Sequence, residues 1–380
     1  FMSLVAMLSG ILNSLHRFAV AAAAPILLNI VLISALAFVT LAGWGNTAHT
    51  GQALVWAVSL AGLVQLAVLW IACRRAGMPL KLRRPRMTNG LRRLISLGIP
   101  GVIAGGITQL NLAISSIIAT WQDSAPSWLY YADRIYQLPL GVIGVAIGVV
   151  LLPSLSQTLR AGDIDVVHST QNRSLELSMF LTIPAAVALM AIPYTVMQVL
   201  FERGAFTNAD TQASAAALAA FAAGLPSFVL IKVFSPGFFA REDTRTPMYF
   251  AGAGVALNII AALVLFQYYG HVGIAVATTA AGWFNAGLLG FTLTKRGHFQ
   301  SDRRLRRSLM MVIVASLSMG LVLLGADHLT RDMFSPGQPL ALRGLILAGL
   351  VGLGAFVFFA IAYATGIFRP AEMKQALGRK

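Results

Sequence analysis

The sequence predicts an all-α polytopic membrane protein, and three observations lead to this fold class. Only 11% of the 380 residues are charged and 57% are hydrophobic, whereas about 25% charged residues is usual for a soluble domain. Uncharged apolar stretches long enough to cross the ~30 Å hydrocarbon layer recur along the whole chain. Two segments far apart in the sequence also resemble each other, which indicates a repeated architecture.

Taken in order, the apolar stretches predict one incomplete span at the start of the chain and ten further spans. Charged or turn-forming residues bound each stretch, and the two neighbours 248–268 and 271–293 are separated only by a tight turn at Tyr269 and Gly270. The chain starts with Phe1 inside an apolar run, so we expect further sequence upstream. The predicted spans lie near 1–15, 20–42, 51–72, 97–120, 128–152, 178–200, 213–238, 248–268, 271–293, 308–326 and 341–366.

Basic residues concentrate in alternate loops, which predicts the orientation. The loops 73–93 and 294–307 hold most of them, and Arg17, Arg160, Arg173, Arg241, Arg245 and the basic tail residues fall on the same side. The opposite loops are nearly neutral, with Asp123, Glu202, Arg203, Asp210, Asp327, Arg331 and Asp332. The positive-inside rule therefore places the basic loops and the C-terminus in the cytoplasm.

A parallel internal repeat predicts the domain organisation. The pattern Ser9-Gly10, Arg17, Leu28-Asn29-Ile30 recurs about 228 positions later as Ser235-Pro236-Gly237, Arg245, Leu257-Asn258-Ile259. Six spans separate the two copies, so the copies keep the same orientation and define two related six-helix lobes. We expect the remainder of the first lobe and a basic loop at 1–93, the second lobe at 94–300, and two additional helices with a tail at 301–380.

Motifs for enzymatic chemistry are absent from the sequence. It contains no Gly-rich phosphate loop ending in Gly-Lys-Ser/Thr and no His/Cys cluster with metal-ligand spacing. The net charge of +15 comes from loops between spans, so it reflects topology and not a nucleic-acid partner. The sequence therefore predicts a protein that is not an enzyme and that needs no cofactor.

The charge pair Asp133–Arg134 predicts the functional site, because no charged residue follows it from Leu138 to Pro153. A charge within a span is costly and is by default a functional hypothesis. Two purely structural roles stay open as well: the Arg134 stem can snorkel to the interface, or Asp133 can neutralise the cation. Lys232 is a second cation within a span, and its partner is unknown. The predicted substrate-binding residues, suited to an anion because cations dominate, are Arg134, Asp133, Gln137, Lys232 and Asn111.

Three motifs resemble one family of membrane proteins. The segment 130–141 reads YYADRIYQLPLG, 201–207 reads FERGAFT, and 235–247 reads SPGFFAREDTRTP. All three are similar to the MurJ (MviN) family of lipid II flippases, within the multidrug/oligosaccharidyl-lipid/polysaccharide exporter superfamily. The resemblance covers nearly the whole chain.

The resemblance implies fourteen membrane helices, with two six-helix lobes around a central cavity and two final helices that form a lipid-lined groove. The chain would begin within the fourth helix, and Arg134 would match a cavity arginine of the eighth helix. The implied activity is the flipping of undecaprenyl-pyrophosphate-linked peptidoglycan precursor (lipid II) across the bacterial inner membrane by alternating access. Lipid II and membrane lipids would be the partners.

Some relatives are expected to bind sodium, and the matching positions here are Ser115, Asn258, Ala262 and Thr278. Asn258 and Thr278 fit that pattern, whereas Ser115 and Ala262 lack the carboxylate that it requires. The resemblance therefore favours the membrane potential over sodium as the energy source.

Two other functions stay open at this stage. An ion-coupled exporter of drugs or polysaccharide-linked lipids predicts acids along the cavity. A membrane scaffold for cell-wall synthesis enzymes predicts that the charges of 81–93 matter more than Arg134.

Overall fold

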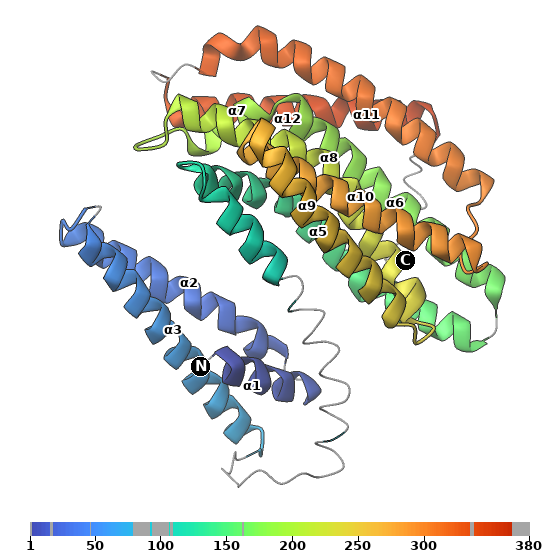
Figure 1. Cartoon of the computed structure of the whole chain (residues 1–380), viewed down its shortest axis with the longest axis horizontal. Coiled ribbons are helices and arrows are strands. Elements are labelled where there is room, and N and C mark those ends of the chain that lie inside the picture. The colour runs from blue at the N-terminus through green and yellow to red at the C-terminus, as the bar shows by residue number, and fades with distance from the viewer. Residues whose placement is uncertain are drawn as a thin grey trace. The chain divides into compact units, whose positions relative to one another are not determined.

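The structure is a computed structural model that describes residues 2–15, 18–45, 47–78, 109–161, 163–334 and 338–366, together with residues 92 and 106. The predicted all-α class is confirmed, and eight helices in the described part are long and apolar enough to span a membrane. The chain divides into two compact units, Phe1–Arg93 and Leu94–Lys380 (Figure 1). Most of the basic loop 73–93, the start of the predicted span 97–120, Arg17 and the basic tail lie outside the described residues.

Unit 1 contains three packed helices, α1 (Met2–Ser14), α2 (Phe18–Leu41) and α3 (Ala48–Arg75). Leu8, Leu12 and Leu69 are almost fully buried where the helices meet. The outer faces are also apolar, since Ile33 is 65% exposed and Trp56 is 75% exposed. Helices that are hydrophobic on all sides are typical of membrane spans, so these faces suit contact with lipid.

Unit 2 is built around α8 (Asn208–Phe239), which packs against its neighbours on most sides. Around it lie α5 (Ala125–Ala161), α6 (Ile164–Ala191), α7 (Pro193–Phe201) and α10 (His271–Lys295) (Figure 1). The contact between α8 and α10 is close because Gly282 of α10 has no side chain. A Cβ atom there would lie 2.5 Å from the hydroxyl of Ser227, and small residues allow such backbone approach between membrane helices.

The remaining helices of unit 2 cover this centre. α9 (Arg245–Tyr269) packs on α10, while α11 (Arg303–Thr330) and α12 (Leu340–Ala364) pack on each other and on α6. A short helix, Gln109–Ala119, precedes α5, and the 3-10 turn η1 (Arg331–Phe334) follows α11. The predicted tight turn between α9 and α10 is confirmed, because Gly270 alone joins them with a φ of 54°. Glycine adopts this left-handed conformation without strain.

The prediction of a single span at 178–200 is wrong. The chain forms α6 up to Ala191 and a separate helix, α7, from Pro193. Proline lacks the N–H that would continue the helix and its ring clashes with the preceding turn, so the helix breaks at Ile192. Hydropathy does not register this break, because the apolar run continues across it. α6 also begins at Ile164, well before the apolar run, since helices extend beyond the hydrophobic part that the sequence pattern detects.

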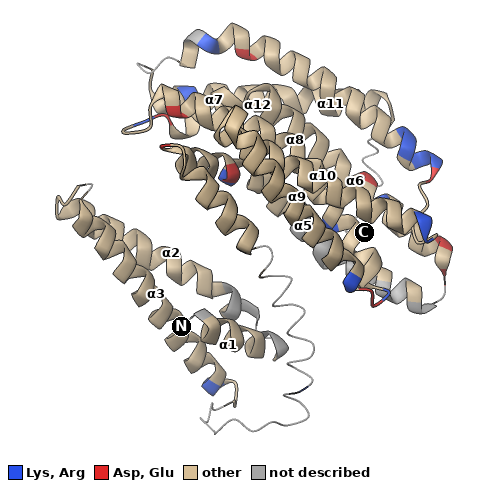
Figure 2. Cartoon of the chain, viewed as in Figure 1, with Lys and Arg blue, Asp and Glu red and all other residues tan. Residues whose placement is uncertain are grey.

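The charges of unit 2 gather at the helix ends, and most basic residues lie at one end of the bundle (Figure 2). This basic end, as we call it, comprises the C-terminal ends of α8 and α10, the N-terminal ends of α6, α9 and α11, and the loops 240–244 and 296–302. The opposite end carries Asp123, Glu202, Arg203, Asp210 and Asp327. The loops that the sequence pattern groups together therefore do lie together within unit 2.

Candidate functional site

The helix α5 presents two different faces. Ala132, Ile135 and Tyr136 are buried, and the Tyr136 ring stacks on Phe221 of α8 with centroids 5.2 Å apart. Residues spaced by three or four positions form the opposite, exposed face, because such residues share one side of a helix. We call this the open face of α5; its residues are Tyr130, Arg134, Gln137 and Leu138.

Arg134 lies on the open face and has no acidic partner among the described residues. Its guanidinium carbon is 4.6 Å from the centroid of the Tyr130 ring, which is a cation–π contact. None of the ion pairs in the described part of the chain includes Arg134. The neighbouring carboxylate of Asp133 instead accepts a hydrogen bond from the side-chain amide of Gln137. A direct ion pair with Asp133, which the sequence left open, is therefore not what the structure shows.

The structure brings only part of the predicted substrate-binding set together. Asp133, Arg134 and Gln137 lie within four positions of α5. Lys232 is exposed on α8 and makes no hydrogen bond or ion pair with the described residues. Asn111 belongs to another cluster, because its side-chain oxygen accepts a hydrogen bond of 2.7 Å from the amide of Asn258. The roles of all five residues stay predictions.

The cluster around Asn258 is polar and consists of uncharged side chains. Asn258 is 2% exposed, and its amide nitrogen also lies 3.5 Å from the hydroxyl of Ser115. Its side-chain oxygen is buried without a partner in the described part of the chain, while the Thr278 hydroxyl donates to the carbonyl of Ile274 at 2.9 Å. Carboxylate, carbonyl and hydroxyl oxygens can all bind a hard cation. The set of two amides and two hydroxyls, with Ala262 at the remaining position, holds no carboxylate, which is the ligand that the resemblance implies for sodium.

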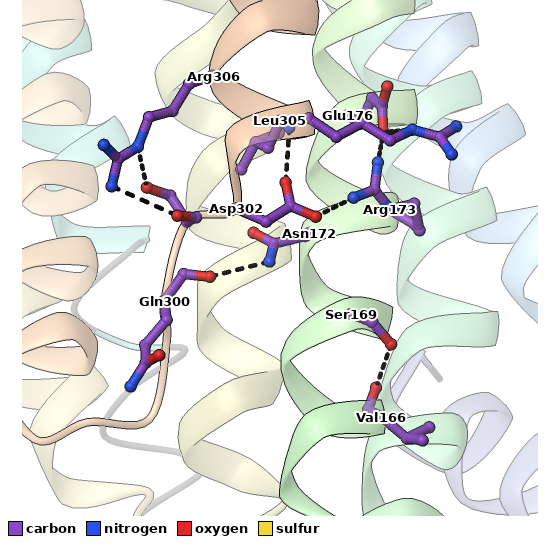
Figure 3. A network of polar contacts seen from close by, with 11 residues as sticks. Val166, Ser169, Asn172, Arg173, Glu176, Gln300, Asp302, Leu305 and Arg306 are labelled. Carbon is purple, nitrogen blue, oxygen red and sulfur yellow. Dashed lines mark hydrogen bonds and ion pairs between the residues drawn. The ribbon is translucent and has the colours of Figure 1, made fainter.

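A second polar centre, which the sequence pattern did not predict, lies at the basic end (Figure 3). Arg173 of α6 contacts the carboxylates of both Glu176 and Asp302, and Arg304 lies 3.5 Å from Glu176. Asp302 also caps α11 by accepting a hydrogen bond of 2.6 Å from the backbone N–H of Leu305. The cap has a local sequence signal, since Asp302 directly precedes the helix. The pairing has none, because Arg173 and Asp302 are 129 positions apart.

A third group fastens the turn between α8 and α9 to the end of α10. Asp243 accepts hydrogen bonds from the backbone N–H of Thr246 (3.0 Å), the Thr246 hydroxyl (2.7 Å) and Arg296 (2.7 Å). Partial burial alone would raise the pKa of the Asp243 carboxyl, but these bonds outweigh it and lower the pKa to about 2. Within each of these two groups at the basic end, the basic and acidic side chains pair with one another. Such pairing suits the anchoring of helix ends.

These features define the class: a polytopic helical membrane protein whose unit 2 exposes, on one face of α5, an arginine that forms no ion pair with a described acid. A family model described as "Lipid II flippase MurJ" matches residues 1–343. The chain therefore belongs to the MurJ family of lipid II flippases. This membership confirms the prediction of a transporter and not an enzyme.

Several curated relatives carry the same family description. The chain is 47% identical over 365 residues to a probable lipid II flippase MurJ of Rhizobium meliloti, covering 96% of this chain and 68% of the relative. It is 45% identical to the corresponding protein of Rhizobium tropici, covering 100% of this chain and 71% of the relative. For the counterpart of Vibrio cholerae the identity is 33%, with 99% and 70% covered.

A comparison with solved structures shows that the chain shares the fold of one such protein. A solved structure titled "Lipid II flippase MurJ, inward closed conformation" superposes with a TM-score of 0.73 at 21% identity, covering 99% of this chain and 72% of that chain. The similarity places the arrangement of helices within the fold of that protein.

Proposed function

We propose that this protein moves lipid II across the bacterial inner membrane and that Arg134 binds the pyrophosphate of the lipid head. The single observation that supports this role is that the Arg134 side chain is exposed on the open face of α5 and unpaired among the described residues. It is exposed, it contacts an aromatic ring, and it forms no ion pair with a described carboxylate. The family membership supports the choice of lipid II as the substrate.

The chemistry of the guanidinium suits this ligand. An arginine can give two parallel hydrogen bonds to a phosphate, and these charge-assisted bonds are roughly twice as strong as neutral ones. Arg134 contacts the Tyr130 ring and makes no hydrogen bond with the described residues, so its N–H edges are available to a ligand. Because Asp133 bonds to Gln137, the nearest acid does not occupy those edges.

The energy source that we propose is the membrane potential. Each positive charge that crosses the field gains about 2.3 kcal/mol per 100 mV, so an emptied cationic site would be driven toward the negative interior. The cluster around Asn258 lacks, among the described residues, the carboxylates that the resemblance implies for a sodium site, which supports this choice over sodium coupling. The orientation that we propose places the basic end of unit 2 and the C-terminus in the cytoplasm, as the positive-inside rule favours.

The test is complementation of a bacterial strain depleted of its own flippase by the full-length protein carrying Arg134→Ala. We expect no growth, although the variant should reach the membrane in normal amounts. Arg303→Ala is the matched control, because Arg303 is an exposed arginine at the basic end, and it should support growth. Full growth with Arg134→Ala would remove the proposed role of this residue.

The proposed energy source has its own test. Transport should fall when an ionophore collapses the membrane potential and should persist when sodium is replaced by potassium at constant potential. A strict requirement for sodium would contradict the proposal and would point back to the cluster around Asn258.

A further inference from the structure

One buried cation in unit 2 has no partner among the residues that the structure describes. Arg343 is 7% exposed, and in that part of the chain it is the only buried Lys, Arg, Asp or Glu side chain. Its Nε and Nη1 atoms are inaccessible to solvent and make no hydrogen bond with the described residues. An unpaired buried charge costs several kcal/mol, so such a residue calls for an anion that satisfies it.

Arg343 lies on the buried face of α12, which it shares with Leu350, Gly354 and Phe358. In this conformation its Nε and Nη1 atoms do not extend to the surface, as those of a snorkelling side chain would. The residues of this face are spaced by four or seven positions and therefore lie on one side of the helix. The guanidinium belongs to the packed side of α12, where α12 meets α7 and α11.

None of the acids that the structure describes forms an ion pair with Arg343. All four ion pairs among the described residues lie at the basic end, and Arg343 lies at the opposite end. Asp327, near the end of α11, accepts a hydrogen bond from Thr195 of α7. Arg343 also lies in the first turn of α12, whose N-cap residue, Pro339, provides no side-chain acceptor. The partial positive charge of a helix N-terminus adds to that of the guanidinium, and both favour a bound anion.

We propose that the end of α12 around Arg343 is a binding site for the phosphate of a lipid headgroup. The 25 residues of α12 extend over roughly 37 Å at 1.5 Å per residue, which exceeds the ~30 Å hydrocarbon layer. The first turn therefore lies at the level of lipid headgroups, where phosphates are the abundant anions. Binding requires the guanidinium to turn toward the headgroup layer. The site is independent of the role proposed for Arg134.

The phosphate has two possible sources, a membrane phospholipid or a polyprenyl pyrophosphate of the kind that the family transports, and one experiment separates them. The unfolding midpoint of the full-length protein in detergent micelles is measured with added phosphatidylglycerol, phosphatidylethanolamine or undecaprenyl pyrophosphate. A lipid at ten times its dissociation constant should raise the midpoint by roughly 1–2 °C. Arg343→Met keeps the length of the side chain but removes its charge, so the rise should be lost.

Each outcome is informative. A rise with phosphatidylglycerol that Arg343→Met abolishes assigns the site to phospholipid. A rise with undecaprenyl pyrophosphate alone assigns it to the polyprenyl lipid if Arg343→Met reduces that rise, because the site proposed at Arg134 also takes this lipid. The control Arg303→Met, at the basic end, should keep the full rise. An equal rise in wild type and Arg343→Met, or no rise with any lipid, would overturn the proposal.

Two more variants address a folding defect and an internal partner. If Arg343→Met does not fold, Arg343→Lys takes its place, because it keeps the charge but loses the two-pronged geometry. Its rise in unfolding midpoint should be less than half that of wild type, and an undiminished rise would count against the site.

Asp327→Asn tests whether Arg343 has an internal partner. Strongly non-additive destabilisation of Asp327→Asn and Arg343→Met without lipid would show that Asp327 is the partner and would overturn the proposal.

Discussion

Arg134 on the open face of α5 and Arg173 at the basic end show two opposite fates of an arginine in the same unit. Arg173 contacts two carboxylates, those of Glu176 and Asp302, so its donors are used within the protein. Arg134 contacts the ring of Tyr130 and no described acid. The comparison teaches that the number of charges does not identify a binding site in such a chain. The distinguishing property is whether the donors of the cation are free.

The sharpest test of this comparison exchanges arginine for lysine in both places. Arg134→Lys keeps the charge but loses the two-pronged hydrogen bonding, which for a charged pair is worth about 1.5–3 kcal/mol. We expect affinity for undecaprenyl pyrophosphate, measured on the purified full-length protein, to fall by roughly ten- to a hundredfold. Arg173→Lys should leave this affinity unchanged. Equal losses in the two variants would break the distinction between the two regions.

The second prediction concerns stability at the basic end. Asp302→Ala removes both the cap on α11 and the contact with Arg173, so we expect a loss of about 1–2 kcal/mol in the free energy of unfolding. Asp302→Asn keeps an acceptor for the Leu305 N–H and should lose about half as much. Denaturant unfolding of the purified protein measures both. An effect on lipid affinity larger than that on stability would contradict an anchoring role.

The sequence predicts the helical class because hydropathy alone decides which segments enter a membrane. It also contains the signals for local features: Gly270 at the turn, Asp302 at a cap, and Pro193 at the break in the 178–200 run. The break was missed because span prediction weighs average hydropathy above a single residue. Arg134 could be singled out from the sequence. The sequence did not show, however, that the Asp133 carboxylate bonds to Gln137 and forms no ion pair with Arg134.

Contacts between distant segments could not be predicted. Asn258 meets Asn111 across 147 positions, and Arg173 meets Asp302 across 129. No periodicity within one helix encodes such pairs, because they depend on the packing of whole helices. The same limit applies to Arg343. In the sequence it is an ordinary loop-proximal arginine, and only the packing of α12 shows that it is buried without a partner among the described residues.

The third prediction uses pH to probe the paired charges. The pKa of Asp243 is lowered to about 2 in the folded protein, below the ~3.9 of an unfolded Asp. A lowered pKa contributes stability above pH ~4 that is lost as the pH falls toward 2. Because Asp243 is partly exposed, we expect only about 1 kcal/mol. Asp243→Asn should show a correspondingly smaller loss of stability between pH 4 and pH 2, and an unchanged pH profile would exclude this contribution.

The smallest expected effect tests how the open face of α5 positions its cation. Tyr130 holds the guanidinium of Arg134 by a cation–π contact at 4.6 Å, and such contacts at exposed sites contribute about 0.5–1 kcal/mol. Tyr130→Leu should therefore weaken lipid binding by roughly two- to fivefold, whereas Tyr130→Phe keeps the ring and should bind nearly as wild type. If Tyr130→Phe loses as much as Tyr130→Leu, the phenol hydroxyl and not the ring face is what matters. The open face would then bind the headgroup through a hydrogen bond from Tyr130 in addition to the charge of Arg134.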